Sequence, residues 1–279
     1  HTSSRRQRQM CIRDRVCIDV DGTLIGESGE PTNGVLDAIM HARSLGQTLA
    51  LSTARGAMGP TADYASLLNP HGWHIFHAGA SLVHTGSGEI IGEALPKDII
   101  RMGTELSGIH GWALEYYCPD DYRSLDDSLA DRPLAAAHSE MLGCDFKIGG
   151  PSDLAEPIVR VQFVVNESQV SEILESMSGK GNVSVATSPV LKGAAFISVT
   201  KEGVNKGSTI LRMCEMLSLD VAEVMMVGDG LNDLDALEVV GHSVAMGNAH
   251  SDLLDFCDYV VAPVGQDGLV EALELSWGI

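Results

Sequence analysis

The fold of this chain is decided by the stretch VCIDVDGTL, residues 16–24. Its apolar start, Val16 to Ile18, predicts a short buried strand, and the carboxylates Asp19 and Asp21 follow directly. Side chains alternate along an extended chain, so both acids would point the same way, and Gly22 lets the chain bend just beyond them. Ligands of open α/β sheets bind at the carboxyl ends of the strands, so we expect both acids at the mouth of a sheet.

Two neighbouring carboxylates repel each other unless a cation or a shared proton offsets the repulsion. The pair therefore indicates a Mg²⁺ site, a nucleophile with its partner acid, or both. The alternatives are a solvated acidic turn or part of a calcium-binding loop. An EF-hand loop needs Gly at its sixth position and a closing Glu, whereas Gly22 is the fourth residue counted from Asp19. The EF-hand interpretation therefore fails.

Composition limits the possible partners. The chain has 279 residues, of which 44% are hydrophobic and 20% charged, as in an ordinary globular protein. Its formal net charge of -20 disfavours nucleic acid and anionic membranes. No apolar run approaches the roughly 20 residues of a membrane span. Six scattered cysteines without a CxxC pair predict reduced thiols and a cytoplasmic location.

The first fifteen residues differ from the rest of the chain. Residues 1–15 are rich in Arg, contain Ser, and lack the apolar centre of a secretory signal. We expect a non-native or disordered N-terminal segment, with a basic arm for nucleic acid as the alternative.

The first and last thirds of the chain alternate between strands and helices. A strand–helix–strand succession at this spacing is a βαβ unit, which implies a parallel sheet. Residues 16–82 and 200–279 are therefore predicted to build one α/β core domain. Its expected helices are 35–45, 60–68, 207–217, 234–240 and 269–275, and its expected strands, after the first, are 47–52, 73–76, 224–227, 243–246 and 259–261.

The middle of the chain has a different pattern. Residues 83–199 contain longer strands of alternating character, which are typical of an antiparallel sheet with one wet face. We expect an inserted α+β domain there. Its predicted strands are 112–117, 159–165, 183–187 and 195–199, and its predicted helices are 97–106, 129–142 and 170–177.

Further polar residues stand at the ends of predicted core elements. Thr53 follows the second strand, Lys206 begins a helix, and Asp229 follows the strand 224–227. Each feature is common by itself, and their order on an α/β scaffold makes the case for a shared site.

Together with the first stretch, these positions lie in five motifs: DVDGTL at 19–24, LSTAR at 51–55, NKG at 205–207, GDGLNDLDAL at 228–237 and VAMGNA at 244–249. With these motifs the chain resembles the haloacid dehalogenase-like superfamily, and within it the Cof-type phosphatases. The resemblance implies a Rossmann-like parallel-sheet core with a large inserted α+β cap.

The resemblance also implies roles. Asp19 would be the nucleophile that forms an aspartyl-phosphate, and Asp21 the acid that protonates the leaving alcohol and then activates water. Mg²⁺ would lie among the Asp19 carboxylate, the Asp21 backbone carbonyl and Asp229. Thr53 and Lys206 would hold phosphoryl oxygens.

Three more positions have open roles. Asn232 could donate to phosphate, and Asp233 could orient Lys206 or a metal-bound water, with structural capping as its alternative. Arg55 is balanced between a substrate contact and a surface salt bridge. The histidines spaced by three, His71, His74 and His77, suggest a metal site, but ordinary solvated and core histidines are favoured.

Two positions depart from the family pattern. Ala54 stands where the family usually has Gly, and Ala78 where it often has Asn. Both positions lie near the expected cap, so they weaken any choice of a particular substrate.

The favoured function is a Mg²⁺-dependent phosphatase acting on a small phosphorylated metabolite such as a sugar phosphate, phosphoglycolate or a similar phosphomonoester. We expect a monomer or weak homodimer. A dehalogenase has no alcohol to protonate, so Asp21 argues against it. A phosphotransferase or phosphomutase is the alternative enzyme. A non-catalytic phosphometabolite-binding protein is the alternative from another class, and the full set of site residues speaks against it.

Overall fold

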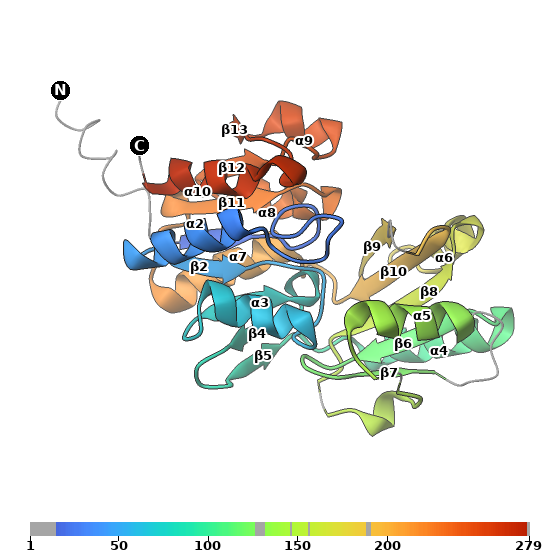
Figure 1. Ribbon diagram of the computed structural model, residues 1–279. Coiled ribbons are helices and arrows are strands. Elements are labelled where there is room, and N and C mark those ends of the chain that lie inside the picture. Colours follow the sequence, from blue (N-terminus) through green and yellow to red (C-terminus); the bar gives the residue numbers. More distant parts are fainter. Residues whose placement is uncertain (1–14, 126–131, 146, 156, 188–190, 278–279) are drawn as a thin grey trace.

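The computed structural model describes residues 15–125, 132–145, 147–155, 157–187 and 191–277 (Figure 1). Of the expected N-terminal segment, all but Arg15 lies outside these residues. Arg15 begins β1 (Arg15–Ile18), one residue earlier than predicted. Its side chain is buried, and its Nη1 lies 3.3 Å from the sulfur of Met213. The strand is longer than its apolar residues suggest, because Arg15 already pairs with Val224 and Thr48 in the two neighbouring strands.

The core sheet has five parallel strands in the order β13-β12-β11-β1-β2. This confirms the predicted α/β fold with a parallel sheet. β1 lies between β11 and β2, with Cys17 opposite Met226 and Ala50. The other strands are β2 (Thr48–Leu51), β11 (Val224–Gly228), β12 (His242–Ala245) and β13 (Tyr259–Val260).

Helices cover both faces of this sheet (Figure 1). Successive side chains of β1 enter opposite layers: Val16 and Ile18 join one apolar cluster and Cys17 the other. The first cluster includes residues of α2 (Asn33–Ser44), α3 (Pro60–Leu68) and α10 (Gly268–Trp277). The second includes residues of α7 (Lys206–Leu217), α8 (Leu234–Val239) and α9 (Ser251–Phe256).

A separate antiparallel sheet, β3-β4-β5, adjoins the core. Its strands are β3 (Trp73–Phe76), β4 (Ser81–His84) and β5 (Ile90–Gly92). We expected β3 in the parallel sheet. It is joined to that sheet by one isolated bridge, between Ile75 and Ser52, the residue after β2. The boundary expected between residues 82 and 83 falls inside β4. The hairpin packs on the core through Leu82 and Ile91, because alternation reveals an antiparallel strand but not the layer that it joins.

The inserted segment forms a five-stranded antiparallel sheet in the order β7-β6-β8-β10-β9, which we call the cap sheet. α4 (Lys97–His110) and α6 (Val170–Ser176) pack on one face. α5 (Arg132–Leu142) packs on the other; the start of that predicted helix lies outside the described residues. The strands are β6 (Ala113–Tyr117), β7 (Tyr122–Ser124), β8 (Arg160–Asn166), β9 (Asn182–Thr187) and β10 (Ala194–Thr200).

The prediction of one wet face on this sheet was wrong. Every residue of β6 and β10 is buried. The polar side chains that suggested exposure, such as Glu115 and Gln162, lie on the face that carries α5 and bond to one another. Alternating polarity therefore marks a buried polar network here, because burial is tolerated when polar groups are paired.

The two segments that join core and cap are tied together by charge. Glu93, just after β5, accepts hydrogen bonds from Lys201, just after β10, at 2.8 Å and from Arg212 in α7. The bond from Lys201 is the main cause that lowers the pKa of Glu93. Entry to the cap and exit from it therefore share one anchor on the core. Among the described residues, no helix has the length and apolar character that crossing a bilayer demands.

Candidate active site

The site begins where β1 ends. The Asp19 amide donates to Val227 of the neighbouring strand at 3.0 Å, and the chain then turns at Gly22 with φ of 82°. A Cβ atom at Gly22 would lie 2.1 Å from Oδ2 of Asp229. Glycine is thus required twice at this position, for its positive φ and for the close approach of Asp229.

Lys206 lies at the centre of the site. It begins α7, which is capped by Asn205 through a 2.7 Å bond from the Ser208 amide. Its side chain is fully buried, and Nζ donates to Asp19 at 2.6 Å and to Asp233 at 2.5 Å. Burial alone would lower the pKa of Lys206, but the two carboxylates raise it above its ordinary value. The ammonium is therefore held charged between two acids.

Asp233 joins this lysine to the turn after β11. One carboxylate oxygen accepts from Lys206, and the other accepts from the amides of Asp229 and Gly230 at 3.1 Å each. A Cβ atom at Gly228 would lie 2.6 Å from the Asp233 carboxyl carbon. Asp233 therefore both closes the turn and contacts Lys206, so the two roles considered from sequence coexist.

Asp229 completes an acidic cluster with Asp19 and Asp233, whose ligand oxygens all lie within 4.8 Å of one another. Burial, followed by the charge of Asp233, raises the pKa of Asp229 to about 7, and the same causes raise the pKa of Asp19 well above its ordinary value. Three carboxylates share one ammonium. Carboxylate oxygens are the ligands that Mg²⁺ prefers, so the cluster fits such a cation.

Asp21 and Arg55 form an ion pair beside the cluster. Nε of Arg55 lies 2.9 Å and Nη2 2.6 Å from the two Asp21 oxygens, and the Asp21 side chain is 63% exposed. Of the two roles considered, Arg55 thus makes a salt bridge, and its partner is the second acid of the motif. The Asp21 carboxylate is outside the acidic cluster, so only its backbone could serve a metal there.

Thr53 is buried at the end of β2, and Asn232 is exposed. Oγ1 of Thr53 accepts from the Arg55 amide at 3.1 Å, which leaves its own proton available to a ligand oxygen. Asn232 lies in the short turn Leu231–Asp233, and its Oδ1 would lie 2.3 Å from a Cβ atom at Gly230.

Two residues of the site were missed in the sequence analysis. Thr23 donates to Asp229 at 3.2 Å, and Asn248 donates to Asp229 at 3.1 Å and to the Gly22 carbonyl at 2.9 Å. Both residues lie inside motifs already recognised, DVDGTL and VAMGNA. Their position in those motifs was the available signal, because each is a small polar residue beside a loop that must approach Asp229 closely.

The three spaced histidines do not form a metal group among the described residues. His74 accepts from the Leu51 amide at 3.0 Å and contacts the Asn69 carbonyl at 2.9 Å. Burial is the main cause that lowers the pKa of His74 to about 4 and that of His77 well below the ordinary value. The favoured interpretation as ordinary histidines therefore fits His74 and His77.

The departure at Ala78 has a backbone consequence. His77, Ala78 and Gly79 all have positive φ, 53°, 53° and 103°. Asn tolerates this region better than Ala does, so Ala78 occupies a strained position that the family's usual residue would relieve.

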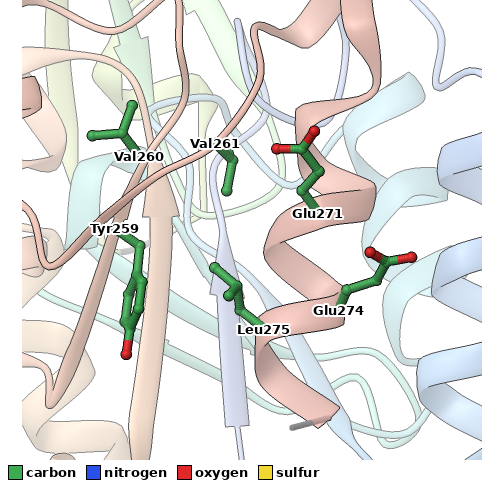
Figure 2. Close-up of a pocket in the computed structure, with 6 residues that line it drawn as sticks. All are labelled: Tyr259, Val260, Val261, Glu271, Glu274 and Leu275. Carbon is green, nitrogen blue, oxygen red and sulfur yellow. The ribbon is translucent and has the colours of Figure 1, made fainter. Parts of the chain in front are cut away.

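A surface pocket of about 350 Å³ lies away from these residues, between β13 and α10 (Figure 2). It is lined by Tyr259, Val260, Val261, Glu271, Glu274 and Leu275. Glu271 accepts from the Ala262 amide at 2.9 Å, so it holds the loop after β13. None of the lining residues contributes to the acidic cluster.

The chain is similar to several known proteins along most of its length. A Bacillus subtilis (strain 168) protein named "Putative phosphatase YxeH" is 24% identical over 263 residues, 92% of this chain and 96% of that protein. A haloacid dehalogenase-like hydrolase from Bacteroides thetaiotaomicron has the same fold, with a TM-score of 0.79, 22% identity, and coverage of 94% of this chain and 99% of the other. A sugar phosphatase of HAD subclass IIB has a TM-score of 0.78, 20% identity, and coverage of 95% and 100%.

The sequence model of one family covers nearly the whole chain. It matches residues 16–273, from the strand before Asp19 to the last helix, and it therefore includes every site residue described above. The chain belongs to the haloacid dehalogenase-like hydrolases.

Proposed function

We propose that this hydrolase is a Mg²⁺-dependent phosphatase that cleaves a small phosphorylated metabolite through an aspartyl-phosphate. The observation that carries the proposal is the Lys206 ammonium, 2.6 Å from Asp19 and 2.5 Å from Asp233, with Asp229 in the same cluster. The cluster has more acids than its one ammonium balances, so it suits a divalent cation, and that cation together with Lys206 would supply the positive charge that a phosphate needs to approach a carboxylate. The names of the relatives support phosphate esters as the substrate class.

Asp19 would attack phosphorus through the oxygen that Lys206 does not hold. The bond from Asp19 to phosphorus forms while the bond from phosphorus to the ester oxygen breaks, and the leaving oxygen takes a proton from Asp21. Asp21 then removes a proton from water, which attacks the aspartyl-phosphate, releases inorganic phosphate and restores Asp19. Arg55, which pairs with both Asp21 oxygens, would hold that side chain beside the cluster, and the oxygen that carries the proton would leave this pair when Asp21 acts as the acid.

The phosphoryl oxygens need donors in both steps. Thr53 would supply its free hydroxyl proton, and Lys206 its charge. Asn232 is exposed beside the same turn and would donate its amide to a phosphoryl oxygen once a substrate is bound. These donors would stabilise the charge that spreads over the equatorial oxygens during transfer.

The metal would be held by Asp19, Asp229 and the backbone carbonyl of Asp21. When bound, Mg²⁺ would supply the positive charge that offsets repulsion between the nucleophile and the phosphate. Thr23 and Asn248, which donate to the two Asp229 oxygens, would hold that carboxylate in orientation.

The test is phosphate release from a panel of sugar phosphates, phosphoglycolate and other phosphomonoesters, with and without Mg²⁺. We expect turnover of at least one ester in Mg²⁺ and none after chelation. Hydroxylamine should trap an acyl phosphate in the wild type and none in Asp19→Asn. Failure to release phosphate from any ester would refute the proposal, and transfer to an added sugar instead of water would identify a phosphotransferase.

A further inference from the structure

The cap supplies a buried cation at its contact with the core. Arg160 begins β8 of the cap sheet and is 4% exposed. Its guanidinium carbon lies 4.0 Å from the centre of the Tyr117 ring, and its Nη1 donates to the Ala54 carbonyl at 2.6 Å. Its Nε has no hydrogen-bond partner, and no carboxylate pairs with it within the part of the chain that the structure describes.

Burial lowers the pKa of Arg160, and the charges of Tyr117 and Glu115 oppose this effect without a direct ion pair among the described residues. A Lys or Arg that only filled space would bury its flexible methylene chain and keep its charged group in water. Arg160 instead donates a hydrogen bond to one backbone carbonyl of the core, that of Ala54. Because Ala54 precedes Arg55, this hydrogen bond connects the cap to the backbone of Arg55.

The Ala54 carbonyl and the Arg55 amide belong to the same peptide unit, which is planar. Arg160 holds the carbonyl end of this unit at 2.6 Å, and Thr53 accepts from its amide end at 3.1 Å. The plane that precedes Arg55 is thus fixed from both sides. One of these two hydrogen bonds comes from Thr53, just after β2 of the core, and the other from Arg160 of the cap.

The next peptide unit is also restrained near the cap. The Arg55 carbonyl accepts from the His77 amide at 2.8 Å, and His77 Nε2 lies 3.1 Å from the Pro119 carbonyl in the loop after β6. The Ala57 amide contacts the same Pro119 carbonyl at 3.4 Å. The backbone on either side of Arg55 is therefore set where cap and core meet.

We propose that Arg160 is a positioning residue for the reaction: it fixes, from the cap, the peptide plane that aims Arg55 at Asp21. This inference rests on the proposed function, because it assigns Asp21 as the acid and base. Without the bond from Arg160, the peptide unit before Arg55 keeps only its bond to Thr53. Through Arg160, the cap thereby positions the acid for the ester oxygen.

The test compares Arg160→Met, Arg160→Lys and Arg55→Met in phosphate-release kinetics. Loss of one charged hydrogen bond predicts a fall in kcat of roughly 10- to 100-fold in Arg160→Met, with KM changed by less than about 3-fold. Arg160→Lys, which can still donate to Ala54, should recover part of the loss. Arg123→Met is the matched control, because Arg123 lies on the cap sheet but pairs with Asp121 at 2.7 Å; its kcat should equal that of the wild type.

A double-mutant cycle distinguishes positioning from mere structural support. If Arg160 acts through Arg55, adding Arg160→Met to Arg55→Met should change kcat by less than about 2-fold. Additive losses would overturn the inference, and so would a raised KM with unchanged kcat, which would mark Arg160 as a substrate contact.

Two further outcomes keep the inference testable. Should Arg160→Met fail to fold, Arg160→Lys carries the same cycle, and its smaller loss must also vanish beside Arg55→Met. An active wild type with an equally active Arg160→Met refutes the positioning role alone, whereas a wild type inactive on every ester refutes the proposed function.

Discussion

The core and the cap each bury a cluster of ionisable side chains, and the two clusters differ in balance. In the core, Asp19, Asp229 and Asp233 face the single ammonium of Lys206. In the cap, Glu115 is fully buried, yet its two oxygens are each 3.0 Å from His138 Nδ1, and one also accepts from Tyr117 at 2.6 Å. The core cluster has acids in excess, and the cap cluster has one acid with several donors.

The difference follows from where the residues lie. Glu115 is in the middle of β6 beside Gln162 of β8, whose amide donates to it at 3.2 Å and whose carbonyl accepts from Ser198 of β10 at 2.9 Å. Its own strand, a neighbouring strand and the covering helix α5 supply its partners. The core acids stand at strand ends and turns, where the ladder stops and a ligand can take the remaining places. We therefore expect a reactive site where a buried cluster has unbalanced charge, and a structural role where the cluster is balanced.

The largest effect should come from removing the nucleophile. Asp19→Asn should lower phosphate release by roughly 10⁴-fold or more, since an amide cannot attack phosphorus. The melting temperature should hold or rise, because one repelling charge is gone. Asp252→Asn, with its side chain 72% exposed, is the matched control and should keep full activity. Activity of Asp19→Asn above a tenth of wild type would contradict the assignment.

Removing the shared cation tests the imbalance directly. Lys206→Met leaves Asp19 and Asp233 buried without their partner, so the free energy of unfolding should fall by about 3–5 kcal/mol. Urea titration at neutral pH measures it. Lys147→Met removes a half-exposed ion pair with Asp121 and should cost less than about 1 kcal/mol. Equal losses in the two variants would show that the core cluster is no more dependent on charge than the surface.

The acidic excess should also appear as a pH dependence in the metal-free protein. The pKa of Asp229 is about 7 in the folded state against an ordinary value of 3.8, mainly because of burial. The folded protein then keeps a proton that the unfolded chain releases, so its stability falls as pH rises from about 4 to 7. The loss should be on the order of 2–4 kcal/mol: the stability is fully present below this window and is lost above it.

Chemical denaturation across that window measures the slope, and Asp229→Asn is its control. The variant should lose most of the dependence between these pH values. Added Mg²⁺ should oppose the fall in the wild type, because it favours the charged carboxylates. A wild-type slope that Asp229→Asn leaves unchanged would assign the proton to another group.

The smallest effect is expected in the cap. His138→Ala should lower the free energy of unfolding by about 1–3 kcal/mol, the cost of a buried acceptor that has lost a donor, and should leave kcat within about 2-fold. In a Glu115→Gln background the stability cost should shrink, as calorimetry can show. A tenfold fall in kcat would mean that the cap cluster is part of the reactive site.

The fold was largely predictable where local chemistry and packing agree. Helix α3 and strand β3 have the predicted ends: Pro60 fits the first turn of a helix, and Trp73–Phe76 is a compact apolar run. The expected boundary between residues 82 and 83 divides the β4–β5 hairpin, whose layer depends on the contacts of Leu82 and Ile91. The prediction of one wet face on the cap sheet was wrong because a sequence does not show which helix covers a strand.

The site was predictable to the level of its motifs. Asp19, Lys206, Asp229 and Asp233 lie together because parallel strands and a helix start meet at one sheet edge. The Asp21–Arg55 pair was open, since a long arginine side chain near a polar site has several possible partners. Arg160 could not be found, because its contact with Ala54 joins residues 106 positions apart across two sheets.

The Glu93 anchor has a consequence for how the protein can be rebuilt. Because Lys201 lies 2.8 Å from Glu93, the whole insertion departs from the core and returns to it at nearly one point. With respect to the connections of the parallel sheet, the insertion is equivalent to a short surface loop, whatever its length. Insertions of other shapes could therefore be exchanged at this junction while the strand order beneath remains intact.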